Sequence, residues 1–227
     1  MANTLDTPQV QSVLGRLFAA AARDHENEPE TVTPGWLASA SARKRADALE
    51  AIYMPISEQG GRLLYSLVRA IRPATVVEFG TSFGISTIHL AAGLTDVGAG
   101  QVLTTELSSA KITAAGTNLA EAGLDQVVTI IGGDARDTLA DVPGPIGLVF
   151  LDGWKDLCLP VLRLLEPRLA SGALVVADDA ENHPNMADYL SYVRDPSHGY
   201  VTVLFPVEDG MELSCWTGSA AQTNLVG

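Results

Sequence analysis

The sequence is poor in cysteine, in aromatic residues and in positive charge. Its two cysteines, Cys158 and Cys215, lie far apart, which predicts reduced packing residues of a cytoplasmic protein and not a disulfide framework. Lysine and arginine number 14 against 27 acidic residues, so the formal net charge is -13. Nucleic acid and anionic membranes bind clusters of basic residues, and this balance therefore argues against both as partners.

Long hydrophobic runs are missing as well. No apolar run approaches the length of a membrane span. The first residues, MANTLDTPQV, lack the basic start and the apolar block that are typical of a signal peptide. The chain is nevertheless 47% hydrophobic with only 6% aromatic residues, so Val, Leu, Ile and Ala can fill a sizeable core. These features favour a globular domain.

Hydrophobic periodicity changes near residue 75. The preceding part predicts three helices, at 10–26, 33–53 and 57–71. Beyond it, short apolar strands alternate with helices, which is typical of a parallel sheet covered on both faces. The last two strands are joined too tightly for a crossover and must be antiparallel. The predicted strands are 75–79, 101–106, 126–131, 146–151, 172–178, 200–207 and 211–216, and the intervening helices are 85–94, 108–123, 134–142, 155–170 and 186–195.

The pattern as a whole predicts a single α/β domain over residues 1–227. A seven-stranded, mostly parallel sheet carries helices on both faces and ends in an antiparallel strand pair. Residues 1–53 form a helical N-terminal cap, and residues 54–218 form the core. In such a sheet, ligands bind beyond the carboxyl ends of the strands.

A glycine turn follows the first strand, in VVEFGTSFGIS (76–86). Gly80 permits a sharp turn, and Gly84 lets the backbone approach a ligand where the next helix opens. The pattern EFGxxxG is not the dinucleotide fingerprint GxGxxG, and the acid Glu78 suits a cationic ligand better than a phosphate. A tight turn without a ligand and a nicotinamide site remain alternatives.

Acids also follow the second and third strands. Glu106 ends the second strand, where a carboxylate can hold a ribose diol. Asp134 and Ala135 follow the third strand and can reach an adenine edge. One acid at a strand end is weak support, because acids commonly cap helices. Three strand ends on one edge together predict a nucleoside ligand.

Three aspartates follow the fourth and fifth strands, in LVFLDGWKDLCL and VVADDAENHP. Asp152, Asp178 and Asp179 can converge, and clustered carboxylates repel one another unless a cation lies between them. Oxygen ligands favour Mg²⁺ first, then Ca²⁺ or Mn²⁺. Adjacent strand residues point to opposite faces, so Asp178 and Asp179 can share an ion only where the strand ends. Alternatively, one of them binds the ion and the other caps the helix near Pro184.

Trp154 and Lys155 stand beside the first of these aspartates. A cation near Lys155 should lower its pKa, and a lysine with a lowered pKa can act as a general base. Trp154 can wall a flat substrate pocket. The alternatives are a surface lysine at a helix start and a tryptophan of the core.

Several of these segments together resemble the catechol O-methyltransferase-like family of class I, S-adenosylmethionine-dependent and cation-dependent O-methyltransferases. The resemblance runs from about Met54 to Gly218. It implies a Rossmann-like fold and Mg²⁺-dependent transfer of a methyl group from S-adenosylmethionine to a hydroxyl of a small catechol-like substrate, with Mn²⁺ or Ca²⁺ as alternative ions. The segments are FLDGWKDLCLP, VVADD, VVEFGTSFGIS, LTTELSS, DYLSYVRDPSHGY and EDGMELSCWTG.

By position, the resemblance implies roles for individual residues. Asp152, Asp178 and Asp179 would hold the metal ion, and Lys155 would be the catalytic base. The cofactor-binding set would be Ile56, Glu78, Gly80, Ser86, Glu106, Leu107, Asp134, Ala135, Asp152 and Trp154. The substrate-binding set would be Met54, Trp154, Lys155, Asp179 and Glu212, with Glu212 on the second hydroxyl.

Three departures from the family pattern concern the site. Asp179 stands where the family has asparagine, and Gly153 replaces a histidine that contacts adenine. Residues 180–184 differ from the family's substrate-gating loop, which leaves the acceptor open. Another natural-product hydroxyl, a non-catalytic cofactor binder and a nicotinamide dehydrogenase are the competing hypotheses. A homodimer is expected from the apolar N-terminal helices and from analogy with bacterial relatives.

Overall fold

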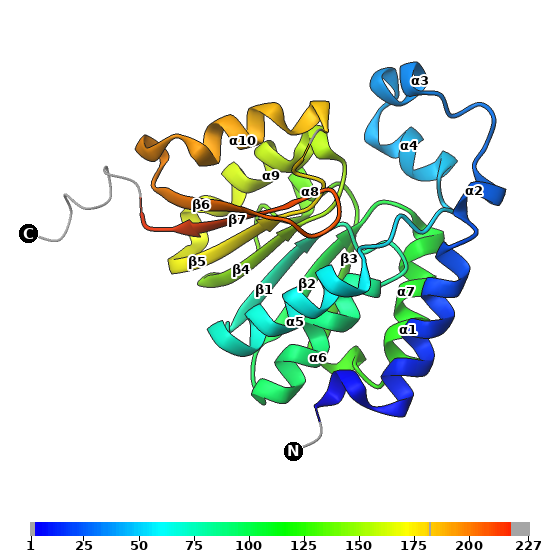
Figure 1. The fold of residues 1–227 in the computed structure, drawn as a ribbon, viewed down its shortest axis with the longest axis horizontal. Helices are drawn as coiled ribbons and strands as arrows, with labels where there is room; N and C mark the ends of the chain where they lie inside the picture. The colour runs from blue at the N-terminus through cyan, green and yellow to red at the C-terminus, as the bar shows by residue number, and fades with distance from the viewer. Residues whose placement is uncertain (1–2, 182, 219–227) are drawn as a thin grey trace, which may run out of the picture.

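The computed structural model describes residues 3–181 and 183–218 as a sheet between two layers of helices (Figure 1). The seven strands have the order β3-β2-β1-β4-β5-β7-β6. Strands β1 to β5 pair in parallel, whereas β7 is antiparallel to β5 and β6, so the predicted fold class is confirmed. The strands are β1 (Thr75–Phe79), β2 (Gln101–Glu106), β3 (Val128–Gly132), β4 (Ile146–Leu151), β5 (Leu169–Ala177), β6 (Tyr200–Phe205) and β7 (Met211–Trp216).

Both faces of the central strands are buried, which explains their continuous apolar runs. On one face, Val76 and Leu148 belong to a core shared with α5 (Glu58–Ile71), α6 (Ile85–Val97) and α7 (Ser109–Glu121). On the other face, Val77 and Val149 pack with α8 (Ala135–Thr138), α9 (Cys158–Leu165) and α10 (Ala187–Arg194). Alternate residues of each strand therefore supply two separate cores.

The strand order reverses between β1 and β4, and this reversal positions the ligand site. From β1 the sheet extends to β2 and β3, and from β4 it extends to β5. The connections after β1 and β4 therefore lead to helices on opposite faces of the sheet, which leaves a crevice at the strand ends. Asp152 N donates to Phe79 O at 2.9 Å, which brings the two loops together. Gly80 has φ +105, and a Cβ there would lie 2.7 Å from Asp152 O. Only glycine fits this crossing without strain.

The N-terminal helices are more broken than the sequence predicts. The segment 10–26 forms α1 (Pro8–Ala21) and α2 (Asp24–Asn27), and the segment 33–53 forms α3 (Pro34–Ser39) and α4 (Ala42–Ala48). The chain is extended at Ala40, and the side chain of Ser41 then caps α4 by accepting from Lys44 N. The prediction of one helix over 33–53 is wrong because this N-cap was read as helix interior.

Other boundaries also shift. The predicted helix 134–142 keeps only α8, and the predicted helix 155–170 is divided into a 3-10 turn (Lys155–Leu157), α9 and a second 3-10 turn (Glu166–Arg168). Strand β5 begins at Leu169, three residues before the predicted start. Strand β3 begins later and β6 ends earlier than predicted. These differences leave every predicted strand in place.

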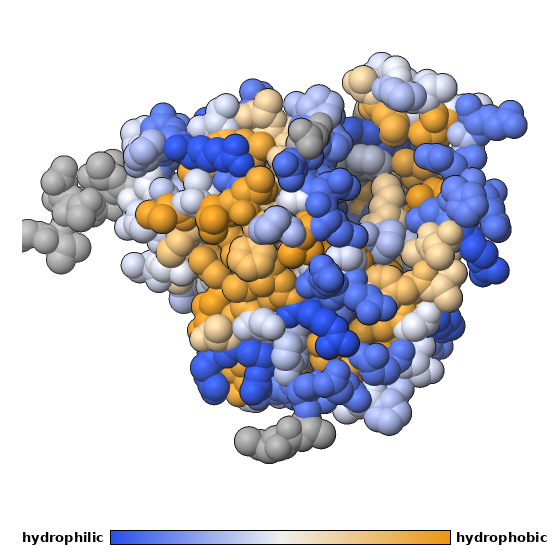
Figure 2. Space-filling view, in the orientation of Figure 1, coloured by the Kyte–Doolittle hydropathy of each residue, from blue (hydrophilic) through white to orange (hydrophobic). Residues whose placement is uncertain are grey.

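The apolar side chains of α1 are used inside the chain. Val10, Val13, Leu14 and Leu17 are buried in the core that contains α6 and α7. The apolar residues behind the predicted dimer contact are thus occupied by this packing, and the homodimer stays a prediction. Large exposed apolar residues are Met54 and, on β6, Val201, Val203 and Phe205. Figure 2 shows a hydrophobic area on this face of the molecule. No helix in the described ranges has the length and hydropathy needed to cross a membrane.

Candidate active site

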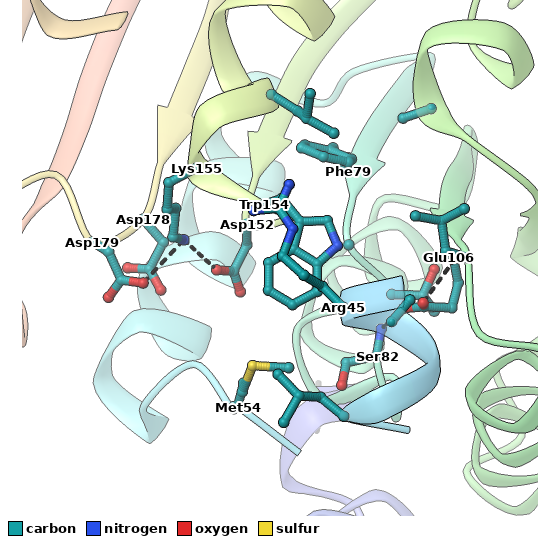
Figure 3. Close-up of a pocket in the computed structure, with 18 of the residues that line it drawn as sticks. Arg45, Met54, Phe79, Ser82, Glu106, Asp152, Trp154, Lys155, Asp178 and Asp179 are labelled. Carbon is teal, nitrogen blue, oxygen red and sulfur yellow. Dashed lines mark hydrogen bonds and ion pairs between the residues drawn. The ribbon is translucent and has the colours of Figure 1, made fainter. Parts of the chain in front are cut away.

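A cavity of about 600 Å³ lies at the carboxyl edge of the sheet (Figure 3). This volume is within the range of small-molecule sites. The loops after β1 to β5, the segment α3–α4 and the turn between β6 and β7 line it. The cavity brings together 13 of the predicted site residues: Met54, Ile56, Gly80, Ser86, Glu106, Leu107, Asp134, Ala135, Asp152, Trp154, Lys155, Asp178 and Asp179.

The three predicted metal ligands converge. Asp152, Asp178 and Asp179 each offer a carboxylate oxygen, and these oxygens lie within 4.8 Å of one another. Strand β5 ends at Ala177, and Asp179 has φ +51 in the left-handed region. The backbone turn at Asp179 is what lets two adjacent side chains reach one site. Aspartate and asparagine both tolerate this conformation, so the departure from asparagine preserves the local backbone.

Lys155 lies among these carboxylates (Figure 3). Its Nζ is 2.9 Å from Asp152 Oδ1 and 3.1 Å from Asp179 Oδ2. Burial acts to lower the pKa of Lys155, but the two carboxylates outweigh it and the pKa is raised. Burial and the Asp152 carboxylate raise the pKa of Asp178 to about 8. The cluster of oxygen donors carries more negative charge than one ammonium balances, which fits a hard divalent cation.

Glu106 is held rigidly at the end of β2. Its Oε1 accepts from Leu107 N at 2.8 Å and from Ser108 N at 2.9 Å, and its Oε2 accepts from Ser82 N at 2.9 Å. A carboxylate has about four acceptor positions, so one of them, on Oε2, remains for a ribose hydroxyl. Glu106 thus fits the predicted ribose contact.

Phe79 accounts for the glycine that replaces the family's histidine. A Cβ on Gly153 would lie 2.4 Å from the Phe79 ring, so that ring fills the space a side chain would need. Phe79 lines the cavity, as do Asp134 and Ala135 across the sheet edge. The adenine side of the predicted site therefore has a wall of different composition from the family's.

The structure does not bring Glu78 into the cavity wall. Glu78 is fully buried beneath the glycine turn and accepts from Thr87 Oγ1 at 2.5 Å and from Thr104 Oγ1 at 2.6 Å. Its Oε1 has no hydrogen-bond partner among the described residues. Burial raises the pKa of Glu78 to about 7.

The buried Glu78 predicts a pH-dependent stability. Its pKa rises from 4.5 to about 7 on folding, so the folded chain binds this proton more tightly than the unfolded chain. The stabilisation is fully present below the unfolded pKa and is lost as the pH rises through the folded pKa, by about 3 kcal/mol. Chemical denaturation should show this loss for the wild type, and a flatter profile for Glu78→Gln. Glu58→Gln, at an exposed position on α5, is the matched control. Parallel pH profiles for the wild type and Glu78→Gln would contradict the prediction.

Glu212 also lies outside the cavity wall. It is fully buried on β7, where Arg194 donates from Nε at 2.8 Å and from Nη2 at 2.7 Å, and Thr202 Oγ1 donates at 2.7 Å. Burial acts to raise the pKa of Glu212, but these donors hold it below its ordinary value. The acids that line the cavity on this side are Glu208 and Asp209, in the turn between β6 and β7.

That turn is attached to the loop after β5. Ala180 N donates to Gly210 O at 2.9 Å, and Glu181 N donates to Asp209 O at 2.7 Å. Glu208 has φ +49, and its Oε2 accepts from Ser57 N at 2.9 Å. The last hairpin thereby completes the wall beside the aspartates.

Two basic residues of the cavity were missed by sequence reasoning. Lys111 on α7 is 4% exposed, burial lowers its pKa, and its Nζ lies 5.6 Å from the centre of the Phe83 ring. Lys111 is the only basic residue of α7, a helix of mostly small and apolar residues, and this feature could have indicated its burial. Arg45 on α4 comes from the segment that the family resemblance does not cover.

Comparisons with known proteins bear on the family and the fold of this chain. A family model described as a methyltransferase domain matches residues 77–180. Catechol O-methyltransferase B of Danio rerio is 33% identical over 179 residues, covering 73% of this chain and 66% of the relative. Catechol O-methyltransferase of Sus scrofa is 30% identical over 148 residues, covering 62% of this chain and 78% of the relative.

This chain belongs to the catechol O-methyltransferase family. The catechol O-methyltransferase of Mycobacterium tuberculosis is 35% identical over 143 residues, covering 63% of this chain and 64% of the relative. The chain thus spans slightly less than two thirds of the Danio rerio and Mycobacterium tuberculosis proteins. Family membership accounts for the motifs at the strand ends.

Solved structures share the family's fold with this chain. The cofactor-bound Rv0187 from MTB has a TM-score of 0.69 at 23% identity, covering 95% of this chain and 94% of that one. The O-methyltransferase TomG from Streptomyces achromogenes, in complex with SAM, has a TM-score of 0.63 at 24% identity, covering 89% and 99%. At these identities the likeness establishes the fold.

Proposed function

We propose that this chain transfers a methyl group from S-adenosylmethionine to a hydroxyl of a small vicinal diphenol, with a divalent cation, Mg²⁺ first, held by the three aspartates. The observation that carries the proposal is the convergence of Asp152, Asp178, Asp179 and Lys155 in one cavity. Relatives named catechol O-methyltransferase support the acceptor class.

The cofactor would lie across the ends of β1, β2 and β4. Glu106 would accept from a ribose hydroxyl, and Gly80, which lines the cavity, would lie beside the cofactor's methionine part. Glu78 is fully buried beneath the glycine turn and outside the cavity wall, so it would support the turn through Thr87 and Thr104 and would not contact the cofactor. Trp154 would flank both the cofactor and the acceptor.

The acceptor would lie beside the aspartates and Lys155. When bound, a cation held by Asp152, Asp178 and Asp179 would supply positive charge that lowers the pKa of the acceptor hydroxyl. Lys155 Nζ would take the hydroxyl proton, and the acceptor oxygen would attack the methyl carbon as its bond to sulfur breaks. The carboxylates that raise the pKa of Lys155 are the ones that would hold the cation. The pKa of Lys155 would fall toward the range of a general base once the charge of these carboxylates is neutralised by a bound cation.

A panel of acceptors tests the proposed function. The protein, S-adenosylmethionine and Mg²⁺ are incubated with catechols, with single phenols and with other hydroxylated natural products, and the products are separated by chromatography. We expect methylated catechols with an equal amount of S-adenosylhomocysteine, and little product from single phenols. Methylation of another hydroxyl alone would assign a different acceptor. Tight cofactor binding without turnover on any acceptor would favour a non-catalytic binder.

A further inference from the structure

We propose that α3–α4 is a lid over the adenosine half of the cofactor site and that Arg45 is its latch. Arg45 is then a positioning residue, because it acts on the cofactor through Trp154. The inference rests on the proposed binding of S-adenosylmethionine. It adds a residue that controls how fast the cofactor binds and leaves, and this residue lies outside the predicted core 54–218.

The latch consists of contacts from Arg45 to both neighbours of Lys155. Arg45 Nη1 and Nη2 donate to Asp156 Oδ1 and Oδ2 at 2.8 and 2.9 Å, a paired geometry that fixes direction as well as distance. The guanidinium carbon also lies 4.6 Å from the centre of the Trp154 ring (Figure 3). The Arg45 side chain is only 9% exposed, whereas that of Asp156 is 43% exposed, so the ion pair is shielded from water on the arginine side only.

The lid lines the same cavity as Glu106, Asp134 and Ala135. Arg43 donates to Leu107 O, which joins α4 to the loop after β2 beside Glu106. The lid supplies mainly apolar residues to the cavity wall, and the sheet edge supplies Asp134 and Ala135. A nucleoside held by Glu106 would lie in the cavity that the lid and the sheet edge both line. The lid residues that line the cavity are Pro34, Leu37, Ala38, Arg45, Ala46 and Leu49.

Besides this ion pair, the lid is held by the Arg43–Leu107 hydrogen bond and by a few buried side chains, among them Leu49 at the end of α4. No side chain of α3 is buried, and in α4 only Ala42, Arg45 and Ala46 are buried. The segment projects from the body in Figure 1, unlike α1, which packs along α7. Segments with few buried contacts open at low free energy, so an ion pair whose arginine is buried should contribute measurably to keeping this one closed.

Cofactor dissociation tests the latch. In Arg45→Met, stopped-flow tryptophan fluorescence should show S-adenosylhomocysteine leaving roughly tenfold faster, as expected when one charge-assisted contact is lost. The KM for S-adenosylmethionine should rise by a similar factor. The KM for the acceptor and kcat should change by less than about threefold, because the aspartates and Lys155 are not altered. A general loss of structure would move all of these quantities together.

Asp156→Asn tests the same pair from the sheet side and leaves α4 unchanged. It should reproduce the faster dissociation, and the double variant should be no worse than either single variant, since both remove one interaction. Lys44→Met, at an exposed position on α4, is the matched control and should leave dissociation unchanged.

Three outcomes would overturn the latch: dissociation rates within about twofold of the wild type in both single variants, additive effects in the double variant, or equal losses in Lys44→Met. If the wild type binds no S-adenosylhomocysteine at all, the proposed function fails and the latch fails with it. That result is distinguishable, because it appears before any variant is made.

Discussion

Lys155→Met is expected to lower kcat by about 10²–10⁴-fold, the usual contribution of a positioned base. Lys155 Nζ is within 3.1 Å of two of the predicted metal ligands, so a proton accepted there would leave from the acceptor hydroxyl beside them. Methionine keeps most of the length and apolar character of the side chain but cannot accept a proton. Single-turnover methyl transfer to a catechol, with saturating cofactor and metal, is the measurement.

Binding must survive in this variant for the result to identify a base. The affinity for S-adenosylhomocysteine should stay within about threefold of the wild type, because the cofactor contacts are made by other residues. The pH profile of the wild type should lose rate on the acid side, where Lys155 is protonated, and the residual rate of the variant should lack that limb. Retention of more than about a tenth of the wild-type rate would remove Lys155 from the role of base.

Removal of divalent cations is expected to lower turnover at least ~100-fold, since a metal ion contributes several kcal/mol to reactions of this kind. Asp178→Asn should weaken binding of Mn²⁺, followed by electron paramagnetic resonance without any substrate. The aspartates converge within 4.8 Å, so we expect one bound ion per chain and lower affinity in the variant.

Glu181→Gln is the matched control for the metal site. Glu181 is exposed, two residues after Asp179, and does not belong to the converging set. Its replacement should leave the Mn²⁺ titration unchanged, which separates loss of a ligand from loss of nearby negative charge. If turnover persists after treatment with EDTA, the chain is still a methyltransferase, but its reaction does not require a divalent cation.

The sheet and the strand-end residues were predictable because local patterns encode them. The apolar run Leu148–Leu151 can only be a buried strand, and its end places Asp152 at the ligand edge. The convergence of Asp178 and Asp179 also depends on the backbone turn at Asp179. The alternation of strand side chains shows that such a turn is required, but it does not predict that the turn occurs.

The rest of the site depends on contacts between distant segments. Glu212 was assigned to the substrate by resemblance, yet the pairing of β7 with β6 places it beside Thr202, and Arg194 on α10 completes its partners. Arg45 lies 111 residues from Asp156, and neither residue indicates the other by any local pattern. Ser41 is a residue type that favours helix N-caps, which indicated a break before α4. The apolar residues on both sides have helical spacing, which favoured one continuous helix instead.

The turn between β6 and β7 allows acceptor binding to be altered separately from cofactor binding. The strands on either side of it complete the outer edge of the sheet, whereas Glu208 and Asp209 line the acceptor side of the cavity. The proposed cofactor side is built from other segments, the loops after β1 to β4 and the segment α3–α4. Glu208 also accepts from Ser57 N, next to Ile56 of the predicted cofactor set, so a library of substitutions at Asp209 is the one expected to sample new acceptors while leaving the methyl donor's binding surface as it is.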